Sequence, residues 1–209
     1  KAPRRGRVKT RLARGIGAGA ATASYRRMTA ALLRRLDAPR RWHLWLAVTP
    51  DADAGAKFWP MSISRFPQGG GDLGRRMQRA FDRLPPGPAV LIGSDIPDVR
   101  RGHVAAAFGA LGDHDAVFGP ASDGGYWLVG LRRRPRIADA FRRTRWSTRH
   151  ALDDTLRNFA ARRVAMIDEL SDVDTPEDYW RWQSAQPALR FSCSRRRGNS
   201  STKLQGRKR

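Results

Sequence analysis

Short polar segments at the ends of apolar runs carry the residue types that bind metals and phosphates. Asp95 lies in GSDIPD, residues 93–98, directly after the apolar run Ala89–Ile92. A carboxylate at the end of a strand can hold Mg²⁺ or Mn²⁺, with substrate phosphates as further ligands. Pro97 would stop the strand and leave Asp95 exposed, whereas Asp98 is the better candidate for capping the next helix. Asp95 is therefore the first candidate metal ligand.

The run KAPRRGRVKTRL, residues 1–12, combines loop formers with positive charge. Pro3 and Gly6 would shape a loop whose amides can face an anion, and Lys9 and Arg11 add cations beside it. A polyphosphate needs this combination, because several close negative charges must be neutralised together. A solvated basic terminus has the same composition, and the residues alone leave both interpretations open.

Two further acidic segments follow later in the chain. Asp123, in SDGGYW, could orient a hydroxyl or a base beside two glycines that let a ligand approach the backbone. Asp-Gly is also a frequent hairpin turn pair. Asp174, in DVDTPED, could supply a second metal carboxylate or could cap a helix.

Weaker candidates are an early glycine pair and a tryptophan-serine pair. Gly71 and Gly74 flank Asp72 at the start of a predicted helix, so their amides could face a nucleotide, or Asp72 could be an ordinary cap. Trp146 and Ser147 could line an acceptor pocket, or could be a core residue and an N-cap. The sequence contains no Gly-x-Ser-x-Gly elbow and no phosphate-binding P-loop, which disfavours those enzyme classes.

Apolar runs alternate with helical patterns, which predicts an α/β sandwich with a mostly parallel sheet. Ligands bind at the carboxyl ends of such strands, where the polar segments fall. One domain is expected over residues 1–185 and a disordered basic tail over 186–209. Strands are expected at 43–49, 61–66, 89–92, 115–118, 126–131 and 164–167, and helices at 18–36, 73–84, 101–111, 136–143, 148–161 and from 175.

The bulk composition fits a cytoplasmic protein of one domain. The chain has 209 residues, 40% of them hydrophobic, and contains neither a long apolar run nor a secretory pattern. A single cysteine, Cys193, excludes an internal disulfide.

The net charge of +22 is concentrated near the two ends of the chain. Residues 1–41 hold 13 basic residues and one acid, residues 190–209 hold eight basic residues and no acid, and the middle is nearly neutral. A nucleic-acid-binding domain carries its charge on a folded face. Nucleic-acid binding therefore stays an alternative rather than the main expectation.

Taken in order, these segments resemble a known bacterial family. KAPRRGRVKTRL, GDLGRRM, VLIGSDIPD, DAVFGPASDGGYWLVGL, WST and DVDTPEDY are similar to the DUF2064 family of the glycosyltransferase-A superfamily of nucleotide-diphospho-sugar transferases. The resemblance spans about residues 1–180. It implies a three-layer α/β/α Rossmann-like sandwich that binds a nucleotide or nucleotide sugar and a small acceptor.

The resemblance also implies roles for individual residues. Asp95 matches the aspartate that holds Mg²⁺ or Mn²⁺, and Asp174 is similar to a second metal ligand; Asp95, Lys9 and Arg11 are the candidate catalytic residues. Acceptor binding is expected at Asp123, Gly124, Gly125, Tyr126, Trp146 and Ser147. Nucleotide binding is expected at Lys1, Pro3, Gly6, Lys9, Arg11, Gly71, Asp72, Gly74 and Ser94.

Two reactions and one non-catalytic function follow as expectations. A glycosyltransferase would use a nucleotide sugar, whereas the pattern KTRL, similar to KSRL of phospholactate guanylyltransferases, points to a nucleotidyltransferase that releases pyrophosphate. Relatives usually begin with an apolar strand ahead of the first Lys-x-Pro, and this chain lacks it. A neighbouring strand should then be unpaired. A binding module without catalysis is the third expectation.

Overall fold

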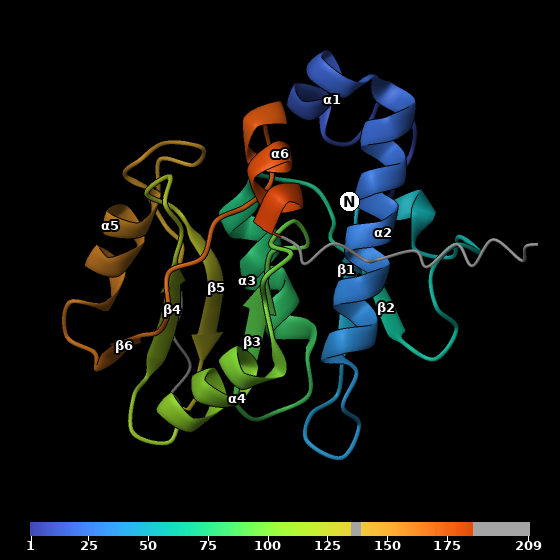
Figure 1. Ribbon diagram of the computed structural model, residues 1–209. Helices are drawn as coiled ribbons and strands as arrows, with labels where there is room; N and C mark the ends of the chain where they lie inside the picture. Colours follow the sequence, from blue (N-terminus) through green and yellow to red (C-terminus); the bar gives the residue numbers. More distant parts are fainter. Residues whose placement is uncertain (135–138, 186–209) are drawn as a thin grey trace, which may run out of the picture.

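A computed structural model describes residues 1–134 and 139–185 of the chain (Figure 1). The predicted tail at 186–209 and the first part of the predicted helix at 136–143 lie outside these ranges. No helix within them is both long and apolar enough to cross a membrane.

Within residues 1–134 and 139–185, six strands form two sheets, which lie side by side (Figure 1). The larger sheet has the order β3-β5-β4-β6, and the smaller one pairs β1 with β2 in parallel. β5 is antiparallel to both of its neighbours, whereas β4 and β6 are parallel, so β3, β4 and β6 run in one direction. The strands are β1 (Trp45–Val48), β2 (Ser64–Pro67), β3 (Ala89–Ile92), β4 (Ala116–Pro120), β5 (Tyr126–Leu131) and β6 (Val164–Met166).

Two of the helices begin where capping signals occur in the sequence. The Asp72 side chain accepts the Arg75 amide at 2.8 Å at the start of α3, and Thr175 and Asp178 cap α6 reciprocally. The helices are α1 (Thr10–Ile16), α2 (Ala18–Leu36), α3 (Leu73–Arg83), α4 (Arg101–Ala110), α5 (Ala151–Leu156) and α6 (Pro176–Ala185), with 3-10 turns at Asp51–Asp53 and Arg157–Phe159.

The larger sheet is packed on both faces, which produces the three-layer sandwich. Successive side chains of a strand point to opposite faces. Phe118 and Val129 pack on one face with residues of α3 and α5, and Val117 and Leu128 pack on the other face with residues of α2 and α4. The predicted α/β/α architecture is therefore confirmed.

Three features differ from the sequence-based expectation. Residues 139–143, the described part of the helix predicted over 136–143, form turns. Residues 10–16 form α1 where a loop was expected, because Leu12 packs with residues of α2 and α6 in a third core cluster. The strand at Tyr126–Leu131 is antiparallel, because only a short connection joins it to β4.

β1 and β3 each pair on one side only within the described residues. The N-terminal residues lie between the carboxyl ends of these two strands. The Ala2 amide donates to the Thr49 carbonyl at 2.7 Å, next to the end of β1. Lys1 contacts Tyr25, which in turn contacts Ser94 just beyond β3. The first residues are therefore fixed at the edge where the predicted metal ligand Asp95 lies.

Candidate functional site

Three chain segments meet at one edge of the larger sheet. β3, β4 and β6 run in the same direction, so their carboxyl ends share this edge. The chain after β6 then turns back across the edge (Figure 1). Leu170 forms a bridge with Ala121 after β4, and the Val173 amide donates to the Asp95 carbonyl at 3.2 Å. This crossing passes β4 and β5 and brings residues of the segment after β6 to the end of β3, at the opposite side of the sheet.

The crossing gathers three carboxylates. Asp95, Asp172 and Asp174 each place one oxygen within 4.8 Å of the others, and all three residues are half-buried. Val173 is buried in the core between the last two. In extended chain, alternate side chains point to the same side, so burying Val173 presents both aspartates together. The sequence patterns predicted Asp95 and Asp174 as metal ligands but not Asp172. The spacing of two residues between Asp172 and Asp174 was the signal that could have identified Asp172.

A buried lysine ammonium lies between the carboxylates. Lys9 Nζ donates to Asp95 at 2.9 Å and to Asp174 at 3.4 Å, and its side chain is only 4% exposed. Burial alone would lower the pKa of Lys9, but the attraction of Asp95, Asp174 and Asp172 raises it above the ordinary value. Lys9 therefore stays protonated, and Arg11 adds a second cation 3.1 Å from Asp174.

Lys9 reaches this position because α1 begins there. Lys9 has φ 48°, a left-handed conformation that turns the chain from the N-terminal loop into the helix. α1 packs against α6, and Pro176 lies so close to Gly15 that a β-carbon on that glycine would be 2.5 Å from the proline ring. The contact fixes Lys9 relative to Asp174, which lies just before α6.

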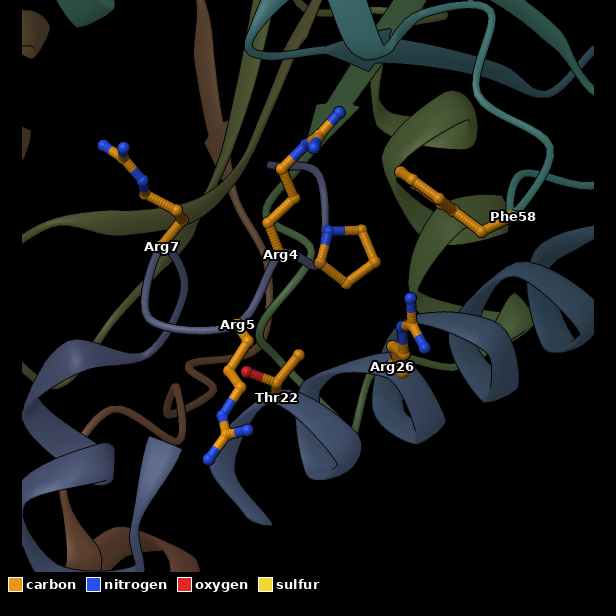
Figure 2. A pocket seen from close by; sticks show the side chains of 7 residues that line it. Arg4, Arg5, Arg7, Thr22, Arg26 and Phe58 are labelled. Carbon is orange, nitrogen blue, oxygen red and sulfur yellow. The ribbon is translucent and has the colours of Figure 1, made fainter. Parts of the chain in front are cut away.

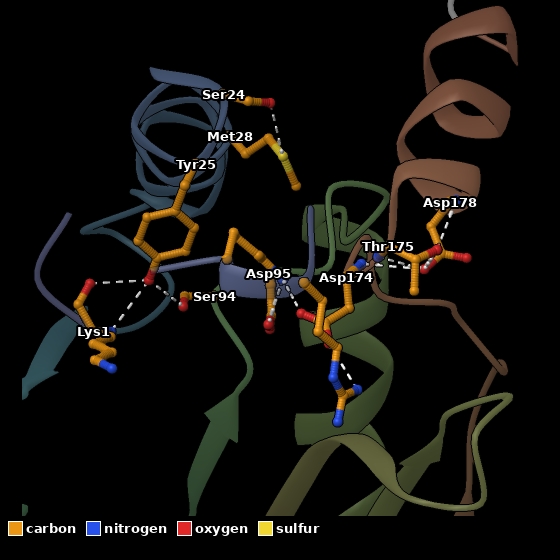
Figure 3. A network of polar contacts seen from close by, with 11 residues as sticks. Lys1, Ser24, Tyr25, Met28, Ser94, Asp95, Asp174, Thr175 and Asp178 are labelled. Atoms are coloured by element: carbon orange, nitrogen blue, oxygen red, sulfur yellow. Dashed lines mark hydrogen bonds and ion pairs between the residues drawn. The ribbon is translucent and has the colours of Figure 1, made fainter. Parts of the chain in front are cut away.

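Tyr25 links the N-terminal loop to the strand end that carries Asp95 (Figure 3). Its hydroxyl donates to the Lys1 carbonyl at 3.0 Å and lies 3.0 Å from the Ser94 hydroxyl. Burial is the main cause of a raised pKa for Tyr25, so the hydroxyl remains a donor at neutral pH. Tyr25 lies within the helix that was predicted over 18–36, and no sequence motif marked it as a site residue.

The donor set fits a hard divalent cation. Mg²⁺ binds carboxylate oxygens at about 2.1 Å, which puts opposite ligands of an octahedron about 4.2 Å apart. Oxygens within 4.8 Å need only small side-chain rotations to reach this spacing. The Lys9 ammonium between two of the carboxylates shows that this position attracts positive charge.

The residues expected to bind the acceptor lie together on the neighbouring side. The Gly124 carbonyl accepts the Leu152 amide at 3.1 Å, and the rings of Tyr126 and Trp146 are 6.4 Å apart, edge to face. Asp123 accepts the Gly125 amide at 2.9 Å within the turn between β4 and β5, so the hairpin-turn interpretation also applies.

This acceptor-side turn faces the carboxylates. Ser122 and Ser171 are 3.0 Å apart, hydroxyl to hydroxyl. Burial, Asp95, Asp174 and, most weakly, Asp123 raise the pKa of Asp172. The two groups of predicted residues therefore share one region at the sheet edge. Ser147 is exposed, with φ 59°.

Several predicted nucleotide-binding residues make other contacts. Gly74 is buried, and a β-carbon there would lie 2.9 Å from Trp146, so this glycine allows α3 to pack closely. Gly71 and Asp72 are exposed at the start of α3, and the described residues give them no contact with the carboxylates. Pro3 is buried and Gly6 is exposed in a turn with φ 70°.

Fold and site together define a glycosyltransferase-A-type α/β protein with a carboxylate cluster at the ends of its strands. The chain belongs to the DUF2064 family, described as uncharacterized proteins conserved in bacteria, whose profile matches residues 32–148. The match includes Asp95 and the Asp123–Tyr126 turn but neither Lys9 nor Asp174.

Solved structures extend the likeness to most of the chain. A crystal structure from Desulfovibrio desulfuricans, provisionally named a nucleotide-diphospho-sugar transferase, is 31% identical, covers 91% of this chain and 87% of its own, and has a TM-score of 0.73. Rv0371c from Mycobacterium tuberculosis shares the fold, with 17% identity, coverage of 77% and 84%, and a TM-score of 0.52. No curated protein matches the sequence.

Proposed function

We propose that this protein is a metal-dependent transferase that moves the sugar of a nucleotide sugar to a small acceptor. The observation that carries the proposal is the convergence of Asp95, Asp172 and Asp174 around the Lys9 ammonium at the carboxyl ends of the strands. The similarity to a provisionally named nucleotide-diphospho-sugar transferase supports the substrate class. A diphosphate needs a compensating cation, and a bare cluster of carboxylates would repel it.

The three aspartates would hold Mg²⁺ or Mn²⁺, which when bound stabilises negative charge on the departing diphosphate. Lys9 remains charged, and Arg11 is exposed beside Asp174, so both can neutralise phosphate oxygens as the leaving group gains charge. The Tyr25 hydroxyl holds the Lys1 carbonyl and Ser94 in place, which orients the loop against the nucleotide.

The acceptor would lie over the turn at Asp123–Tyr126. Asp123 is exposed and can accept a hydrogen bond from an acceptor hydroxyl. Trp146 and Tyr126, partly buried against the core, lie edge to face near this turn and would form its aromatic side. With both substrates held at one sheet edge, positioning and electrostatics supply the rate enhancement without a covalent intermediate.

A nucleotidyltransferase is the second candidate, favoured by one specific contact. Lys9 and Arg11 both lie against Asp174, so two cations would lie next to the phosphates of a nucleotide bound at the carboxylates. A nucleoside triphosphate carries more negative charge than a nucleotide sugar and would use both. This enzyme would release pyrophosphate, whereas the glycosyltransferase would release a nucleoside diphosphate.

The test is a thermal-shift screen of nucleoside triphosphates and nucleotide sugars with Mg²⁺ or Mn²⁺, followed by identification of the released phosphate compound. Ligands that bind the folded state raise its melting temperature. Asp95→Asn should abolish the metal-dependent shift and turnover. Asp98→Asn, an exposed aspartate three residues away, is the matched control. Equal shifts and turnover in both variants would refute the proposal.

A further inference from the structure

Helix α2 presents a row of arginines to solvent. Arg26, Arg27, Arg34 and Arg35 are all exposed, whereas the large apolar residues of the same helix are buried in the core. The helix thus separates its residues into one basic face and one apolar face.

Two hollows follow this basic face and share Arg26. The first has a volume of about 630 Å³ and is lined by Pro3, Arg4, Arg5, Arg7, Thr22, Arg26 and Phe58. In Figure 2, Arg5, Thr22 and Arg26 lie along α2, and Phe58 faces them from the connection between β1 and β2. The second, of about 790 Å³, continues past Arg27, Arg34 and Arg35 to Pro97 and Trp182.

The two hollows adjoin at Arg26 and are together named the α2 groove, defined by Arg5, Arg7, Arg26, Arg27 and Arg34. The stretch from residue 22 to residue 34 of a helix is about 18 Å long, at 1.5 Å per residue. This length suits a segment of an extended polymer better than one small molecule.

One acid, Asp98, lines the second hollow, but most of the positive charge of the α2 groove has no ion-pair partner among the described residues. Arg4, at its margin, is bound to the buried Asp53, and Arg35 donates to the carbonyls of Pro97 and Val99. The five arginines that define the groove form no ion pair with any described residue. Like charges placed so close repel one another, so a polyanion would be favoured there.

We propose that the α2 groove binds single-stranded nucleic acid. Arginines along the groove would contact successive phosphates, and Phe58, 39% exposed in the first hollow, offers a ring on which a base can stack. An anionic membrane fits less well, because a helix that lies on a bilayer exposes its apolar face, and that of α2 is buried.

Much of the N-terminal positive charge lies on a folded surface of the protein. Residues 1–41 hold 13 basic residues and one acid, which sequence analysis attributed to a terminal region. In the folded protein, five of these residues line a single groove instead. A basic folded face is the electrostatic footprint of nucleic-acid binding.

The test compares two triple variants of the full chain for binding a fluorescent oligothymidine of about 12 nucleotides, within the usual range of single-strand sites. Arg26→Gln, Arg27→Gln and Arg34→Gln remove groove charges. The matched control removes three exposed arginines elsewhere: Arg143→Gln, Arg162→Gln and Arg163→Gln. Anisotropy is measured against salt in EDTA, so the result does not depend on the proposed metal-dependent activity.

The groove variant should reduce the slope of log K against log salt by about 2, since each phosphate contact on a single strand contributes about 0.7. The control variant should retain the slope. Phe58→Leu should weaken binding about fivefold or more and leave the slope unchanged, because stacking is not ionic.

Three results would overturn the proposal. An equal loss of affinity for the oligonucleotide in the two triple variants would show that binding depends only on the net charge of the protein. Equal affinity for the single strand and its duplex, with no effect of Phe58→Leu, would exclude a stacking groove. Tighter binding to phosphatidylserine vesicles than to the oligonucleotide, lost in the same groove variant, would assign the surface to a membrane.

Discussion

Replacing Lys9 with methionine tests whether the buried ammonium compensates the carboxylate cluster. The change keeps an unbranched side chain, one atom shorter, but removes the charge that lies 2.9 Å from Asp95 and 3.4 Å from Asp174. Breaking a fully buried ion pair costs about 3–5 kcal/mol. The two carboxylates are 38% and 32% exposed, and water screens them, so we expect a smaller loss of about 2 kcal/mol.

A loss of this size is measurable by thermal unfolding. For a protein of 150–250 residues, 1 kcal/mol shifts the melting temperature by about 2–4 °C, so Lys9→Met should melt about 4–8 °C lower. Lys57→Met, at an exposed lysine, should melt close to the wild type. Mg²⁺ should restore more stability to Lys9→Met than to the wild type, because the cluster has lost its internal cation.

The stability that the Lys9 ammonium contributes should decrease at high pH. The neighbouring aspartates raise the pKa of Lys9 above its ordinary 10.5, so the folded state holds the proton more tightly than the unfolded chain. The advantage of the wild type over Lys9→Met should be complete at neutral pH, and should shrink as the pH rises through the folded-state pKa. Equal melting temperatures for the Lys9 and Lys57 variants, with equal responses to Mg²⁺, would refute this account.

Three other substitutions test neighbouring parts of the structure. Burial and Asp95 raise the pKa of Asp172, so without metal Asp172→Asn should raise the melting temperature at neutral pH by about 2–4 °C. This gain in melting temperature should vanish below pH 3.8, where Asp172 is protonated in both states. The same substitution should reduce the rise in melting temperature that Mg²⁺ causes. Gly124→Ala should lower the free energy of unfolding, measured by chemical denaturation, by about 2 kcal/mol, because φ is 83° and a β-carbon would lie 2.2 Å from a backbone oxygen. Gly102→Ala is the control, because a β-carbon on Gly102 would meet no atom within 4 Å. A hydrogen-bonded Arg145 guanidinium holds the pKa of Asp154 well below its ordinary 3.8, so the stability advantage over Asp154→Asn should be present above pH 3.8 and lost in more acidic solution. An advantage that persists unchanged in strong acid would contradict that last assignment.

Local signals in the sequence were sufficient to predict most elements. The apolar run at Ala89–Ile92 and the amphipathic pattern at Ala18–Leu36 have the same bounds in the structure. The capping signals at Asp72 and Thr175 also hold. α1 was not predicted, because its stability comes from packing against α2 and α6 rather than from its own seven residues.

The sequence by itself determined the α/β class and the candidates Asp95 and Asp174, since a carboxylate after an apolar strand is a local pattern. Only the tertiary structure brought Asp172 into the cluster, placed Lys9 between carboxylates 86 and 165 residues away, and aligned five arginines along one groove. Periodicity fixes the direction of a side chain within its own element. The distance between elements depends on how the chain crosses the sheet edge, and that is set by packing of the whole core.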